Sequence, residues 1–112
     1  MKIDRALIIK KEWLDKIFDD GKVWEMRSTR TKVRGKIALI ESGSGLIVGE
    51  ANLMYCSDKP ISNHPSQFKY HQVEDAELLK KWKYAWGLSC AKRYEKPIPY
   101  NHPQGAVIWV KL

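Results

Sequence analysis

The order of apolar and polar residues divides the chain into strand-like and helix-like segments. Apolar runs, or alternation with a period of two, predict strands over residues 2–10, 23–28, 35–42, 46–56, 84–91 and 105–112. Stripes of apolar residues at helical spacing predict helices over residues 11–20 and 74–82. The first and last strands are too hydrophobic for an open sheet edge. The pattern therefore predicts an α+β fold in which about six strands close, or nearly close, into a barrel.

Two connecting segments interrupt this pattern. Residues 57–71 are rich in proline and polar residues, and a loop of this length in a small protein is often functional. After the alternating segment 84–91, Pro97 and Pro99 predict an extended turn. We therefore expect the sheet to be broken at both places.

The length and composition suit a single domain over residues 1–112, with a core large enough to fold without a disulfide or a structural metal. The two cysteines and three histidines belong to no metal-binding spacing. The apolar run near the start covers only Ala6 to Ile9, which is too short for a signal sequence or a membrane span. We expect a soluble, cytoplasmic protein, most simply a monomer, with no metal or cofactor.

Charge is distributed unevenly along the chain. The net charge is +7, and residues 26–40 carry five cations and no acid, while residues 80–96 carry six cations and one acid. Such blocks are typical of a phosphate-binding surface, although a merely solvated face would carry the same charges. The charge pattern indicates a nucleic acid or a nucleotide as the partner, and it leaves both RNA and DNA open because this electrostatic attraction does not distinguish the two.

One short motif makes the prediction more specific. The first predicted strand and helix are followed by residues 22–27, which read Lys-Val-Trp-Glu-Met-Arg and contain the start of the next strand. This order resembles the ASCH domain family, whose hallmark at that place is Gly-x-Lys-x-x-Glu-x-Arg. Lys22, Glu25 and Arg27 match the hallmark, whereas Asp20 occupies the position of its glycine. Later segments also look like this family, so the resemblance covers nearly the whole chain.

The resemblance implies a PUA-like β-barrel of about six strands with two or more flanking helices. Related domains bind RNA, and some of them recognise a modified base in a pocket. The resemblance therefore implies a protein that binds single-stranded RNA or a nucleobase in a basic cleft. A few small bacterial relatives are similar to enzymes, either amidohydrolases that deacylate N-acetylated cytidine or ribonucleases, so a hydrolase is the alternative.

The motif supplies the candidate binding groups. Glu25 and Arg27 share one strand face, where the guanidinium can bind a phosphate or a base edge and the carboxylate can accept from an exocyclic amine. Lys22, at the start of the strand, can neutralise a phosphate. The structural alternative is an ion pair that only orients the corner between the helix and the strand.

Further binding groups are expected around these three residues. Arg30, Lys32 and Arg34 in the following loop would meet phosphates, and we expect them to converge with the motif on one water-accessible hollow. Trp86 is the best candidate for a wall of that hollow, because unpaired bases stack on aromatic rings. The other tryptophans, Trp24 among them, are assigned to the core.

An enzyme would use the same residues differently. Lys22, with its pKa lowered by burial, would act as base or nucleophile, with Glu25 as an assisting carboxylate and Glu74 as a weaker third member. The enzyme relatives carry a threonine three residues after their lysine, where this chain has Glu25.

Overall fold

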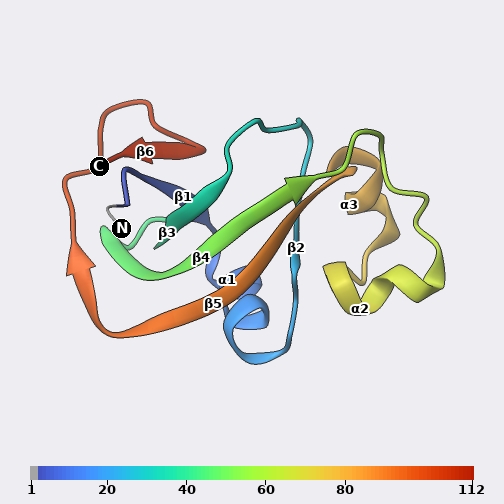
Figure 1. Ribbon diagram of the computed structural model, residues 1–112, viewed down its shortest axis with the longest axis horizontal. Coiled ribbons are helices and arrows are strands. Elements are labelled where there is room, and N and C mark those ends of the chain that lie inside the picture. Colours follow the sequence, from blue (N-terminus) through green and yellow to red (C-terminus); the bar gives the residue numbers. More distant parts are fainter. Residues whose placement is uncertain (1–2) are drawn as a thin grey trace.

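The computed structural model describes residues 3–112, and within them six strands form one curled sheet flanked by short helices (Figure 1). The strands, in the order β2-β5-β4-β3-β1-β6, are β1 (Arg5–Ile9), β2 (Trp24–Arg27), β3 (Gly35–Glu41), β4 (Leu46–Cys56), β5 (Tyr84–Pro99) and β6 (Trp109–Lys111). The helical segments are α1 (Lys11–Asp19), the 3-10 turn η1 (Pro65–Gln67), α2 (Phe68–His71) and α3 (Ala76–Lys81). The predicted α+β fold is confirmed, with the sheet curled into a half-barrel.

The antiparallel strands β4 and β5 are the longest in the sheet and pair along its length, and β5 is longer than the sequence predicts. Its partner β2 covers only Tyr84–Gly87, so the remainder of β5 pairs with β4 alone and has an open edge on its other side. Proline is tolerated at such an edge, because one row of backbone amides has no ladder partner there. β5 therefore continues through Pro97 and Pro99, and the turn predicted there is wrong.

The last strand is shorter than predicted. Only Trp109–Lys111 pairs with β1, while residues 105–108 bend and leave Val107 76% exposed. The bend still follows β1, because the N–H of Ile8 donates to the carbonyl of Ile108 at 2.9 Å. This segment becomes a wall of the cavities described below.

The main core lies between α1 and the concave face of the sheet. α1 buries Leu14 and Ile17 against apolar side chains of β1, β3, β4 and β5. Because these positions recur at the helical spacing, the sequence pattern identified them correctly. α1 is thereby fixed across the sheet, with its C-terminal end leading into β2.

The helix predicted over residues 74–82 forms as the shorter α3. It begins after Asp75, whose side chain accepts a hydrogen bond from the N–H of Glu77 at 2.9 Å and so caps the first turn. Leu79 is buried against Met26 of β2, which fixes α3 on one face of that strand. No helix in residues 3–112 is long and apolar enough to cross a membrane.

Candidate functional site

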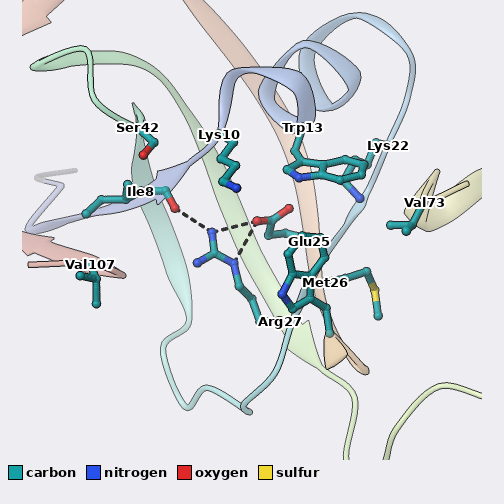
Figure 2. A pocket seen from close by; sticks show the side chains of 11 residues that line it. Ile8, Lys10, Trp13, Lys22, Glu25, Met26, Arg27, Ser42, Val73 and Val107 are labelled. Carbon is teal, nitrogen blue, oxygen red and sulfur yellow. Dashed lines mark hydrogen bonds and ion pairs between the residues drawn. The ribbon is translucent and has the colours of Figure 1, made fainter. Parts of the chain in front are cut away.

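A pocket of about 190 Å³ lies between β2 and the end of β1, where the curled sheet does not close (Figure 2). β2 is an edge strand of the sheet, and the guanidinium of Arg27 reaches from it to the carbonyl of Ile8, donating at 2.7 Å. A side chain therefore bridges the seam that backbone pairing leaves open. The pocket is lined by Ile8, Lys10, Trp13, Lys22, Glu25, Met26, Arg27, Ser42, Val73, Trp82 and Val107.

Lys22 owes its position to the turn that ends α1. Gly21 adopts φ +75°, a left-handed conformation that favours glycine and stops the helix. The backbone N–H of Lys22 then donates to the carbonyl of Lys16 at 3.1 Å. This turn directs the lysine side chain inward, and the residue is only 2% exposed.

The buried amine of Lys22 has two partners. It donates a hydrogen bond to the carbonyl of His71, and its nitrogen lies 5.1 Å from the centre of the Trp13 ring. Burial lowers the pKa of Lys22 to about 8, against the opposing attraction of the Glu25 carboxylate. A lysine with such a pKa can give up its proton near neutral pH, which an exposed lysine does not do.

Glu25 and Arg27 form a buried ion pair inside the pocket. Nε of Arg27 lies 2.9 Å and Nη2 lies 2.8 Å from the same oxygen, Oε2 of Glu25. The side chain of Glu25 is 6% exposed and that of Arg27 is 18% exposed. The other carboxylate oxygen, Oε1, has no hydrogen-bond partner among residues 3–112 and points away from Arg27 (Figure 2). It is available to accept a hydrogen bond from a ligand.

Trp86 packs against the guanidinium of this ion pair and does not line the pocket. It is 1% exposed, and its indole N–H donates to the carbonyl of Thr29 at 2.9 Å. The guanidinium carbon of Arg27 lies 5.6 Å from the Trp86 ring, and Trp109 stacks on the same ring at 5.9 Å. The prediction that Trp86 forms a wall of the hollow is wrong, because its ring is buried in the main core and is covered by Arg27 and Trp109.

Two other tryptophans form the aromatic wall. Trp13 and Trp82 both line the pocket and meet edge to face, with ring centres 6.0 Å apart. Both are partly buried and also pack against core residues, which is why their apolar stripes predicted core positions. The sequence held no signal that one side of each ring would stay open.

Lys10 is a further lining residue that the sequence analysis missed. It is exposed, follows β1 directly and extends toward the Glu25 carboxylate (Figure 2). Its place between the apolar strand and the helix is the only sequence signal it gives. With Lys22 and Arg27 it brings three cations to a pocket in which Glu25 is the only carboxylate among the described residues.

A second cavity, of about 450 Å³, adjoins the first. The two share Ile8, Ser42 and Val107 as walls, so they form one groove that continues from the seam past the β3–β4 turn. The far wall contains Tyr100 and His102, whose hydroxyl and Nδ1 lie 2.8 Å apart. The groove therefore continues from a charged pocket into a more open part with polar aromatic side chains.

The arginine-rich loop does not reach this groove. Arg30 pairs with Asp58 at 3.1 Å, Arg34 donates to the carbonyl of Thr31 at 3.0 Å, and Lys32 is exposed. None of the three cations lines either cavity within the described chain. The expectation that they share one hollow with the motif is wrong, because the loop leaves the pocket directly after β2.

Glu74 is also outside the pocket. It is exposed and precedes α3, whereas its neighbour Val73 provides the lining contact. The structure therefore brings Lys22, Glu25 and Arg27 together but adds no second carboxylate to them in the described part of the pocket.

Comparisons with known proteins agree with the motif and the fold. The model of one protein family, the ASCH domain, matches residues 7–98. Among solved structures, the crystal structure of ASCH from Zymomonas mobilis superimposes with a TM-score of 0.70 over 96% of this chain and 86% of that chain. The sequence identity is 13%, so this likeness shows the fold alone, and it confirms the PUA-like α+β architecture. No curated protein matches the sequence.

Proposed function

Because this chain belongs to the ASCH domain family, we propose that it binds RNA and takes one unpaired nucleobase into the pocket between β1 and β2. One observation carries this proposal: Glu25 Oε1, Lys22 and Arg27 face one pocket whose wall is made by Trp13 and Trp82. Proteins that read unpaired bases combine the same two elements, aromatic surfaces for stacking and fixed donors and acceptors for the base edge.

The size of the pocket supports a single base as the ligand. Sites that enclose drug-sized molecules measure roughly 300–1,000 Å³, and this pocket is smaller at about 190 Å³. One heterocyclic ring fits, while a sugar and phosphate must extend beyond it. The adjoining cavity, which shares Ser42 and Val107 with the pocket, lies where they would extend.

The charges support the same ligand. Lys10, Lys22 and Arg27 exceed the single carboxylate of the pocket, and the whole chain carries +7. Exposed cations of the loop after β2 add an attraction to phosphates that depends on salt and not on sequence. On this proposal the pocket selects the base, and the loop raises affinity for any polyanion.

The decisive experiment compares two arginines that differ in place and not in charge. Arg27→Ala removes a pocket donor, and Arg34→Ala removes an exposed cation whose hydrogen bonds stay within its own loop. Affinity for a labelled single-stranded RNA of about ten nucleotides is measured by anisotropy. We expect Arg27→Ala to weaken binding about tenfold or more, as for a lost charged hydrogen bond, and Arg34→Ala only about twofold.

Equal losses for the two variants would contradict a base-binding pocket. Thermal unfolding of Arg27→Ala checks that the seam still closes, since Arg27 also bonds Ile8. A DNA strand of the same sequence decides between RNA and DNA, because a site that reads the 2′-hydroxyl binds RNA more tightly.

One observation favours a hydrolase as a second candidate function. Lys22 has a pKa of about 8 and lies in the pocket with Glu25, so its neutral amine can act as a base toward an N-acylated cytosine. Release of cytidine from N-acetylated cytidine, followed by chromatography, tests this function. We expect Lys22→Met to abolish turnover and Lys10→Met, in the same pocket, to retain it. Absence of turnover by the wild type would exclude this candidate.

A further inference from the structure

A chain of aromatic side chains lies on the face of β2 opposite to Glu25. Trp24 projects to that face, its indole N–H donates to the hydroxyl of Tyr55 at 2.6 Å, and its ring packs against Tyr70 with centres 5.0 Å apart. Tyr55 is 48% and Tyr70 is 38% exposed, and Trp24 is partly buried. We call Tyr55, Trp24 and Tyr70 the aromatic platform.

A glycine fixes the orientation of the Tyr55 ring. Gly87 stands in register between Tyr55 of β4 and Trp24 of β2. A Cβ added to Gly87 would lie 2.3 Å from Cε1, 2.3 Å from Cζ and 2.6 Å from Cε2 of Tyr55. Three ring atoms at such similar distances mean that the ring lies flat over the glycine, so its other face is turned outward. The hydrogen bond from Trp24 holds it there.

A cation completes this surface. The amine of Lys69 lies 5.1 Å from the centre of the Tyr70 ring, and it forms no ion pair with any residue between 3 and 112. Packing of a tyrosine over a strand glycine is known to stabilise sheets, which accounts for the inner face of Tyr55. It does not account for an outer face that is 48% exposed and held by a hydrogen bond from Trp24, at one end of a row of rings whose other end carries Lys69.

We propose that the aromatic platform stacks an unpaired base of a single-stranded nucleic acid, as a second contact beyond the seam pocket. Flat, exposed and immobilised rings next to a cation are the elements of sequence-tolerant stacking surfaces. A nucleic acid is favoured over a docking protein as the occupant, because the chain has a net charge of +7, which attracts polyanions. The proposal goes beyond the base pocket and does not require it to be occupied.

The experiment alters the ring in two independent ways. Tyr55→Ala removes the ring, and Gly87→Ala leaves it in the sequence but places a methyl group where it lies. Tyr55→Phe keeps the ring without its hydroxyl, and Met54→Ala removes a neighbouring side chain that is 57% exposed. Affinities are measured for a labelled single-stranded RNA of about ten nucleotides and for uridine monophosphate, which is too small to reach beyond one site.

We expect Tyr55→Ala and Gly87→Ala to weaken binding of the RNA strand by about tenfold, the loss of one stacked base, and Tyr55→Phe and Met54→Ala by less than about twofold. Binding of the mononucleotide should not change in any of them. Thermal unfolding shows whether each variant folds, and Gly87→Ala with Tyr55→Ala in one chain should fold at least as well as Gly87→Ala alone.

The proposal would be overturned if Tyr55→Ala and Gly87→Ala both fold and bind the RNA as tightly as the wild type does. So would a loss of self-association in Tyr55→Ala without a loss of RNA affinity, since the platform would then be a protein contact. These outcomes leave the proposed pocket untouched, because that proposal depends on Arg27→Ala. If Tyr55→Ala loses affinity for the single-stranded RNA while Arg27→Ala keeps it, the result would support the platform and exclude the pocket as a binding site.

Discussion

Arg27 and Arg30 are three residues apart, yet they lie in opposite surroundings. The side chain of Arg27 is 18% exposed and is held by Glu25 and by the Ile8 carbonyl, whereas that of Arg30 is 57% exposed and pairs with the exposed Asp58. A charge in the pocket is fixed in position and poorly solvated, so it can select a ligand by geometry. A charge in the loop is screened by water and salt, so it attracts phosphates without selecting among them.

The largest effect should come from breaking the buried pair. Glu25→Gln leaves the Arg27 guanidinium in the pocket without its counter-ion, and we expect the free energy of unfolding to fall by about 3 kcal/mol. Asp58→Asn, which breaks the exposed pair with Arg30, should change it by less than about 1 kcal/mol. Urea unfolding of both variants measures the difference. Similar values for the two would mean that pocket and loop hold their charges in the same way.

Burial of Lys22 should make the free energy of unfolding depend on pH. Its pKa is about 8 when folded and 10.5 when exposed, so between these values the unfolded chain binds more protons. The free energy of unfolding should therefore rise as the pH rises from about 8 to about 10.5, by up to about 3 kcal/mol. Lys22→Met lacks this contribution, and subtracting its pH profile from that of the wild type removes the titration of other groups. A flat difference would show that the amine is solvated.

The smallest effect should come from the loop. Lys32→Ala removes one exposed cation, so the free energy of unfolding should change by no more than about 0.5 kcal/mol. The plot of log affinity for RNA against log salt should become shallower by about one unit if Lys32 neutralises a phosphate. Titrations at several salt concentrations measure the slope. An unchanged slope would remove Lys32 from the phosphate-binding surface.

The sequence predicted the elements well where one face of each is buried. The range of β4 was predicted correctly, and α1 was predicted to within a residue at its end. The motif also predicted which residues meet, because Glu25 and Arg27 share a strand face and the turn at Gly21 brings Lys22 beside them. Period and spacing determine such local relations directly.

The burial of side chains on the two faces of β2 and β5 could not be predicted from the sequence. The sequence pattern predicts a pocket position for Trp86, which is buried, and a core position for Trp24, which has one side in the exposed platform. Alternation separates the two faces of a strand but does not say what covers each face in the folded sheet. That depends on α1 covering one face and on α3 only partly covering the other, which are long-range relations.

The second cavity could not be predicted for a related reason. Residues 105–108 read as an apolar strand, but they bend beside β1 and place Val107 between the two cavities. The prediction counted their hydrophobicity as evidence for sheet. Their position depends on the bond between Ile8 and Ile108, which joins opposite ends of the chain.

The hydrogen bond from Arg27 to Ile8 has a consequence for how occupancy and stability are linked. The same guanidinium latches β2 to β1 and offers donors to whatever enters the pocket. A ligand that leaves this latch fastened adds its own binding energy to the folded state and raises the melting temperature. A ligand that draws the guanidinium away breaks that hydrogen bond as it binds, so at the same concentration it binds more weakly and raises the melting temperature less.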